Sequence, residues 1–148
     1  MEETMQACKQ LLDYVACYDN AALWFIVSDM ILSVHSNASY LSKKKARSRA
    51  GGNFYLTNEK YETFKNRAVL TISLIIKHIM ASASEAELAA MLYNYRKAIP
   101  MKITLEEMGH PQPPTNVSVD NSTAHGLTQG TMIPKKSKAM DMRFHWLK

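Results

Sequence analysis

Asp29-Met-Ile-Leu-Ser-Val-His-Ser-Asn-Ala-Ser-Tyr40 is the stretch of the sequence that decides the fold. Leu32 and Val34 take alternate positions in it, which predicts a β-strand with one protected face. His35 and Asn37 fall on the other face of the same strand, because side chains alternate along an extended chain. The polar end of this strand is the first of three places where we expect ligands for a metal.

Two further strands are predicted downstream. Residues 47–57 contain the pair Gly51-Gly52, which allows a bulge or a close backbone approach within a strand. Residues 67–78 are dense in β-branched and apolar side chains, which favours a central strand buried on both faces. Residues 43–46 form a polar, basic turn between the first two strands. Three strands on short connections favour an antiparallel meander.

A long helical region is predicted after the third strand. Ser82 or Ser84 can cap its beginning, because a side-chain hydroxyl accepts a hydrogen bond from the first helical turn. Pro100 marks a break or a kink. Residues 101–108 then form a further helix, and Gly109 closes it.

Other elements complete the predicted order. Residues 4–18 have apolar side chains at helical spacing. Residues 116–120 form a short fourth strand in which Val117 and Val119 are buried and Asp120 lies on the other face. A last amphipathic helix is expected near the C-terminus. The order indicates an α/β fold with a mixed sheet, built from a three-stranded antiparallel meander plus a further strand and flanked by helices.

Composition indicates an ordinary globular domain. Of 148 residues, 47% are hydrophobic and 21% are charged, which excludes a disordered chain. No apolar run is long enough to span a bilayer, and the N-terminus is acidic where a signal peptide would be basic. We therefore expect an intracellular protein, in the cytoplasm or nucleus, that has no membrane partner. The two cysteines, Cys8 and Cys17, lack the spacing of a zinc site and favour burial as small apolar groups.

The net charge of +5 is concentrated in two clusters. The first consists of Lys43, Lys44, Lys45, Arg47 and Arg49, and the second contains Lys135, Lys136 and Lys138. Such clusters fit contact with a phosphate backbone, where electrostatics supplies much of the affinity. A solvated, lysine-rich loop explains the same pattern, and the charges alone slightly favour that explanation.

Carboxylates mark the other two candidate places. Glu85 and Glu87 lie at the start of the long helix, and Asp120 ends the fourth strand. Carboxylates that converge from separate elements can hold two hard divalent cations for phosphodiester hydrolysis. The pattern alone favours a plain helix cap at Asp120 and its neighbours, and helical periodicity does not choose between the two glutamates.

Five segments in one order carry a family resemblance. They are residues 29–40, Ala46-Arg-Ser-Arg-Ala-Gly-Gly52, Ala83-Ser-Glu-Ala-Glu-Leu88, Val119-Asp-Asn-Ser-Thr123 and Lys138-Ala-Met-Asp-Met-Arg-Phe-His-Trp-Leu147. Together they resemble the ribonuclease H region of copia-type retrotransposon reverse transcriptase polyproteins, over nearly the whole chain. The opening helix, with Leu11-Leu-Asp-Tyr14, resembles the end of the polymerase portion that precedes this region.

The resemblance implies a mixed sheet flanked by helices that cleaves the RNA strand of RNA–DNA hybrids with two Mg²⁺ ions. By the resemblance, Glu87 and Asp120 are metal ligands and catalytic residues, while Asn37 takes the place of a family aspartate. Asn121 and the basic residues, including Lys135 and Lys136, are the expected nucleic-acid contacts. The expected partners are an RNA–DNA hybrid and the polymerase portion of the same polyprotein.

Two departures from the family predict impaired activity. An amide at Asn37 removes a negative charge, which weakens the binding of a hard dication. The sequence also stops before the family's last strand and its acid-bearing helix, so we expect residues 23–148 to be a C-terminally truncated ribonuclease H-like domain. Residues 1–22 are expected to be a helix and linker from the polymerase portion. A non-catalytic module that binds nucleic acid is the alternative.

Overall fold

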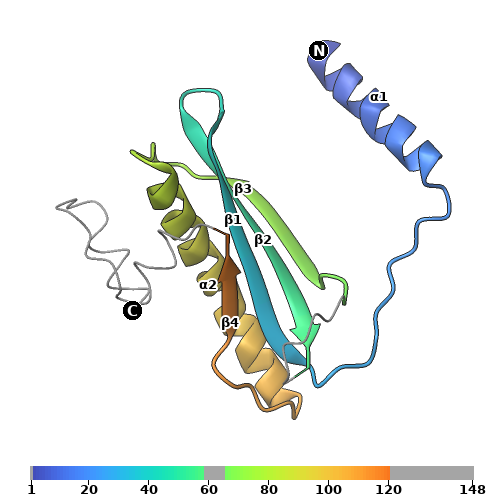
Figure 1. The fold of residues 1–148 in the computed structure, drawn as a ribbon, viewed down its shortest axis with the longest axis vertical. Coiled ribbons are helices and arrows are strands. Elements are labelled where there is room, and N and C mark those ends of the chain that lie inside the picture. The colour runs from blue at the N-terminus through green and yellow to red at the C-terminus, as the bar shows by residue number, and fades with distance from the viewer. Residues whose placement is uncertain (1, 59–65, 121–148) are drawn as a thin grey trace.

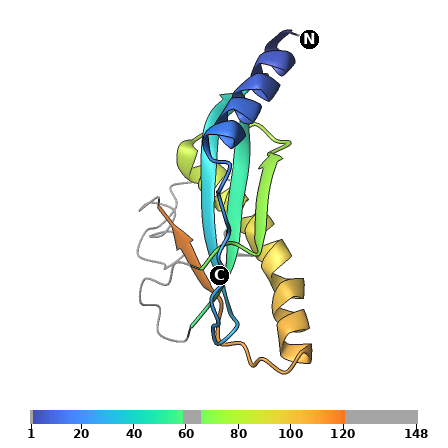
Figure 2. The ribbon, with the colours of Figure 1, turned by 90° about the vertical axis from the view of Figure 1, so that its right-hand side faces the viewer.

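The computed structural model describes residues 2–58 and 66–120, which form a mixed four-stranded sheet with a long helix packed on one face (Figures 1 and 2). The elements are α1 (Glu2–Cys17), β1 (Ile31–Lys43), β2 (Arg47–Thr57), β3 (Leu70–Ile75), α2 (Ala83–Glu107) and β4 (Asn116–Val119). The α/β class, the order of these elements and the basic turn between β1 and β2 are confirmed.

The strands lie in the order β3-β2-β1-β4. β1 pairs antiparallel with β2, and β2 pairs antiparallel with β3, so the predicted meander is confirmed. β4 pairs in parallel with β1, with Ser36 opposite Val119. A parallel neighbour requires a crossover, and α2 provides it.

The alternation along β1 divides the sheet into two faces. Leu32 and Val34 are buried on the face that α2 covers, where they pack with Phe54. His35 and Asn37 are exposed on the opposite face, as the sequence predicts. We call the face without α2 the outer face.

β3 corrects the prediction of a central, doubly buried strand over residues 67–78. The strand is shorter and lies at the edge of the sheet, and its exposed positions include Thr71 and Ser73. Ile76 and Met80 follow the strand and fill the core beneath α2. The apolar residues of this segment therefore lie on one face of β3 and in the buried connection that follows it.

α2 is one continuous helix, which corrects the separate helix predicted over residues 101–108. Pro100 lies inside it, and the Thr104 hydroxyl donates to the Pro100 carbonyl. Ser82, rather than Ser84, caps the beginning of the helix. The predicted closure at Gly109 is confirmed, since this residue has a φ of 90° and its N–H donates to the Glu106 carbonyl.

The side chain of Gln112 fastens the loop before β4 to the beginning of β1. Its Oε1 accepts from the Leu32 N–H at 2.9 Å, and its Nε2 donates to the Met30 carbonyl at 2.9 Å. The amide thus occupies the place of a neighbouring strand at these two residues, directly before β4 begins to pair with β1 at Ser33.

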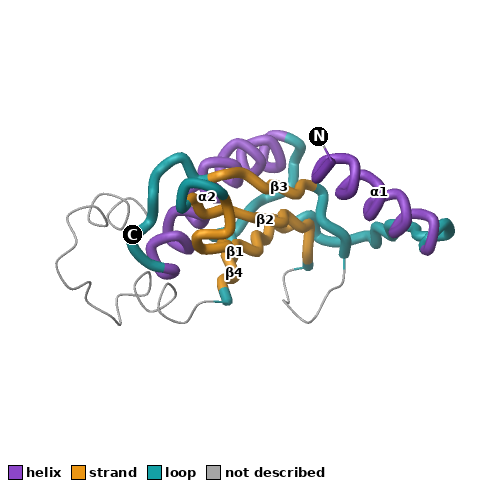
Figure 3. The backbone as a smooth tube through the Cα atoms, turned by 90° about the horizontal axis from the view of Figure 1, so that it is seen from above, coloured by secondary structure: helices purple, strands orange, loops and turns teal. Residues whose placement is uncertain are grey.

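α1 stands away from the sheet and, in the described part of the chain, has no buried residue (Figures 1 and 3). The prediction that helices flank the sheet holds for α2, and α1 belongs to residues 1–22, which are predicted to be a helix and linker outside the sheet domain. Cys8 and Cys17 are both exposed, so their predicted burial is wrong. Their apolar neighbours give the spacing of a buried helix, but no part of the described sheet covers them.

Some predicted features lie outside the described residues. They are the last amphipathic helix, the nucleic-acid contacts Asn121, Lys135 and Lys136, and most of the loop between β2 and β3. Within the described residues, the structure contains no helix of the length and apolarity that crossing a membrane requires.

Candidate functional site

Asn37 and Asp120 directly follow the last paired residues of the parallel strands β1 and β4. Ser36 is opposite Val119, and each of the two polar residues is the next one along its strand. Both are exposed, and alternation points them to the outer face. The parallel pairing therefore brings together two of the three residues that the sequence singled out.

Glu87 approaches the same place from α2. The residue is 6% exposed, and its Oε1 accepts from the Ala38 N–H at 3.0 Å. Ala38 lies two residues beyond Ser36, the last residue of β1 that pairs with β4. Glu87 is therefore held at the point where the paired segment of β4 ends.

Glu85 is engaged in the helix cap instead. Its N–H donates to the Ser82 hydroxyl at 3.1 Å, and its Oε2 accepts from the Ala81 N–H at 2.7 Å. This arrangement is similar to a capping box, except that the carboxylate accepts from the residue before the cap. The geometry thus distinguishes two glutamates between which periodicity could not choose.

Burial raises the pKa of Glu87 above its ordinary value of 4.5. The hydrogen bond from Ala38 acts in the opposite direction, and the negative charge of Asp120 raises the pKa again. Glu87 Oε2 is buried and has no hydrogen-bond partner among the described residues. A buried carboxylate oxygen without a donor, close enough to feel a second carboxylate, fits a position that faces a cation.

Glu87→Gln tests whether burial and the charge of Asp120 destabilise the ionised form of the Glu87 carboxylate. Because the raised pKa makes the folded state hold the proton more tightly, the free energy of unfolding of the wild type falls as pH rises from about 4.5 through the folded pKa. The variant lacks this loss, so in EDTA we expect it to be the more stable protein at neutral pH. Urea unfolding over a series of pH values measures the difference. If the wild type gains stability over the variant as pH rises, the assignment is wrong.

The predicted basic residues occupy two different environments. Lys43, Lys44, Lys45 and Arg47 are exposed around the β1–β2 turn. Lys44 approaches Glu3 at 3.9 Å, but both side chains are more than 90% exposed, so this ion pair contributes little. Arg49 instead lies half-buried on the outer face, where its Nη1 donates to the Ser73 hydroxyl at 2.9 Å.

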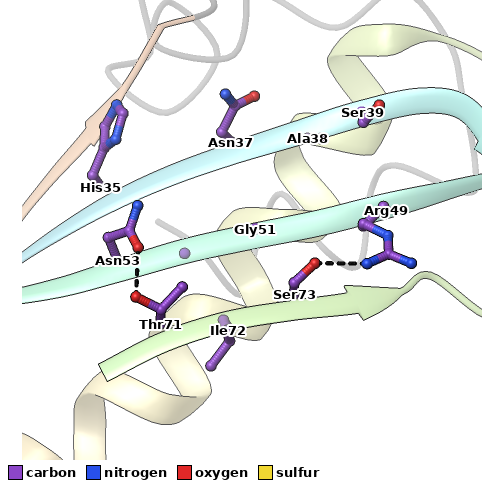
Figure 4. Close-up of a pocket in the computed structure, with 11 residues that line it drawn as sticks. His35, Asn37, Ala38, Ser39, Arg49, Gly51, Asn53, Thr71, Ile72 and Ser73 are labelled. Atoms are coloured by element: carbon purple, nitrogen blue, oxygen red, sulfur yellow. Dashed lines mark hydrogen bonds between the residues drawn. The ribbon is translucent and has the colours of Figure 1, made fainter. Parts of the chain in front are cut away.

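A hollow on the outer face extends from Asn37 across β2 to β3 (Figure 4). It adds polar residues that sequence reasoning did not select, among them Asn53, Thr71 and Ser73. Their alternation along β2 and β3 was a usable signal, because it puts every second side chain on one face. This alternation was not used for β3, because the sequence pattern predicted a strand buried on both faces.

Two carboxylates are available at the site for a divalent metal. Among residues 2–58 and 66–120, no group of three His, Cys, Asp or Glu side chains is placed to hold an ion. Glu87 and Asp120 are the described acids that interact there, and Asn37 offers a neutral amide oxygen beside them. These donors suit a hard cation, with less charge than a third carboxylate would provide.

Comparison with known proteins gives one informative similarity. The chain is 27% identical over 147 residues to the retrovirus-related Pol polyprotein from transposon TNT 1-94 of Nicotiana tabacum. This similarity supports an origin in a retrotransposon polyprotein. It covers 99% of the chain and 10% of the relative, so the chain spans about a tenth of that protein's length. No family model matches the chain, and no solved structure matches it significantly.

Proposed function

We propose that this chain is a copia-type ribonuclease H-like domain that cleaves the RNA strand of RNA–DNA hybrids weakly, with Mg²⁺. The observation that carries the proposal is that Glu87 accepts from the Ala38 N–H and interacts electrostatically with Asp120 where the β1–β4 pairing ends, one residue from Asn37. The sheet order, with a meander followed by a parallel fourth strand, agrees with the fold that the resemblance implies.

The unsatisfied oxygen of Glu87 supports a metal at this position. Two nearby carboxylates repel each other when both are ionised, and a cation that binds between them offsets this repulsion. Glu87 and Asp120 would hold the ion, and Asn37 would contribute its amide oxygen. When bound, Mg²⁺ polarises the scissile phosphate and lowers the pKa of a water molecule.

The residues of the chain have separate tasks in this proposal. Burial and the Ala38 N–H fix the orientation of the Glu87 carboxylate. Asp120 is exposed, and it provides the negative charge that reaches the solvent side of the site. Asn37 contributes a neutral oxygen at the position where the family has an aspartate. The site therefore carries one negative charge fewer than the family's site, which accounts for weak activity.

A cleavage assay with a labelled RNA–DNA hybrid tests the proposal. We expect slow turnover that depends on Mg²⁺ and is lost in Glu87→Gln and in Asp120→Asn, since each substitution removes one of two charges. Glu107→Gln, at the far end of α2, is the matched control and should leave turnover unchanged. Turnover that persists in both site variants would contradict the proposal, and so would no turnover in the wild type and in Asn37→Asp.

The alternative function is nucleic-acid binding without cleavage. The exposed basic residues around the β1–β2 turn favour it, because they can neutralise phosphates without a metal site. It predicts binding that weakens steeply with salt, in EDTA, together with no cleavage by the wild type or by Asn37→Asp.

A further inference from the structure

The hollow on the outer face is a candidate binding groove that the proposed metal site does not explain. Its volume is about 500 Å³, and it lies on the side of the sheet opposite α2 (Figure 4). We call it the β-face groove and define it by six polar side chains from three strands. They are His35, Asn37, Arg49, Asn53, Thr71 and Ser73.

The chemistry of the β-face groove suits an oxyanion with hydrogen-bonding neighbours. Arg49 provides a permanent positive charge, and the other groups are hydroxyls, amides and an imidazole. The described residues that line the groove include no aspartate or glutamate. Arginine together with serine, threonine and asparagine is the set of side chains with which proteins contact phosphate and sugar groups.

Hydrogen bonds within the β-face groove hold its polar side chains in place. The Arg49 guanidinium donates to Ser73, and the Thr71 hydroxyl donates to Asn53 Oδ1 at 2.8 Å (Figure 4). Arg49 Nε is buried and has no partner among the described residues. A buried N–H donor without an acceptor is costly, so a movement of the Arg49 side chain that let this group donate to a ligand oxygen would relieve that cost.

Gly51 leaves the middle of the β-face groove open. A Cβ atom at this position would meet the Asn37 carbonyl oxygen at 3.7 Å and the Ile72 carbonyl oxygen at 4.0 Å, which is ordinary contact. A side chain at this position would therefore fill the groove without disturbing the sheet. Glycine permits a ligand to approach the backbone closely.

We propose that the β-face groove binds the phosphodiester backbone of a nucleic-acid strand and leads it to the site at Asn37 and Asp120. This proposal rests on the proposed function, since it names the surface that binds the substrate. Arg47 lies two residues from Arg49 on β2, and Lys43, Lys44 and Lys45 follow at the turn. A row of cations that continues beyond the groove suits an extended polyanion better than a single small anion.

Gly51→Val in the full chain is the sharpest test. Its side chain blocks the groove and leaves the α2 face untouched, and valine favours strands. We expect the affinity for a short RNA–DNA hybrid, measured in EDTA by fluorescence anisotropy, to fall by about tenfold or more. Ser33→Val is the matched control, because it places the same side chain on the outer face of β1 outside the groove.

Arg49→Gln is a second variant with a different readout. Loss of one phosphate contact should reduce the slope of log affinity against log salt by about 1. Lys97→Gln removes one charge from an exposed position on α2 and should leave hybrid binding within about twofold of the wild type. Circular dichroism and thermal unfolding establish that each variant is folded.

The outcomes separate this proposal from the proposed function. If folded Gly51→Val binds the hybrid as tightly as the wild type does, the groove proposal is overturned. The cleavage proposal is unaffected by that result. If Gly51→Val does not fold, an unchanged affinity and salt slope in Arg49→Gln overturn the groove. A wild type that does not bind the hybrid in EDTA overturns the groove, while the Mg²⁺-dependent cleavage assay decides the proposed function separately. Loss of affinity in Gly51→Val and Arg49→Gln, with both controls unchanged, supports the groove.

Discussion

Gly52→Ala is expected to destabilise the fold by about 3 kcal/mol or more, because the new methyl group enters space that Asn94 already fills. An added Cβ would collide with Asn94 Oδ1 and lie 2.7 Å from Asn94 Cγ and 2.9 Å from Asn94 Nδ2. Asn94 is 0% exposed, and its Nδ2 donates to the Ser36 hydroxyl at 2.8 Å and to the Gly51 carbonyl at 2.9 Å. Moving the amide would break both hydrogen bonds inside the interface between α2 and the sheet.

Urea unfolding with a double-mutant cycle measures this effect. Gly51→Ala is the matched control and should change stability little, since its methyl group points to the open outer face. Asn94→Ala is itself destabilising, but Gly52→Ala should cost much less in that background because the collision is gone. Equal costs of Gly52→Ala with and without Asn94 would show that the two residues do not compete for space.

Asn37→Asp is expected to raise the affinity for Mg²⁺ by at least about tenfold, because it adds a negative charge next to Asp120. Without metal, the same charge repels Glu87 and Asp120, so the variant should be less stable than the wild type in EDTA. Thermal unfolding with and without Mg²⁺ should therefore show a much larger metal-dependent shift for the variant. Cleavage of the hybrid should increase in parallel.

Asn53→Asp is the control for this prediction. It also places a carboxylate on the outer face, where the acceptor of the Thr71 hydrogen bond is retained, but it lies on β2 away from Asp120. We expect no gain in Mg²⁺ affinity from it. Equal responses of the two variants to Mg²⁺ would mean that added surface charge, and no specific site at Asn37, binds the ion.

The alternation in the deciding stretch was enough to predict much of the sheet. Leu32 and Val34 are buried and His35 and Asn37 are exposed, as their spacing indicates. β3 could not be predicted equally well, because Ile76 and Met80 lie close to it in sequence and pack into the core from a connection. The sequence pattern predicts a break or a kink at Pro100 with a separate helix after it, whereas the structure continues one helix through this residue.

The candidate site was predicted in part. Asp120 and Asn37 could be placed on one face by alternation, but their closeness depends on the parallel register of β1 and β4, which no local pattern contains. The choice of Glu87 rested on the resemblance, and the bonds of Glu85 to Ser82 and Ala81 required coordinates. The β-face groove was not predicted, since it depends on the register of three strands.

The amide of Gln112 has a consequence for how the proposed site could be lost. It bonds to Met30 and Leu32 directly before β4 begins to pair with β1, whereas Asn37 and Asp120 follow the last paired residues at the opposite end. A substitution at Gln112 would remove both hydrogen bonds between this loop and β1 while every acidic residue was retained. A comparison of related sequences that only counts their carboxylates would then classify such a sequence as intact, although the contacts that fasten the loop before β4 to β1 had been lost.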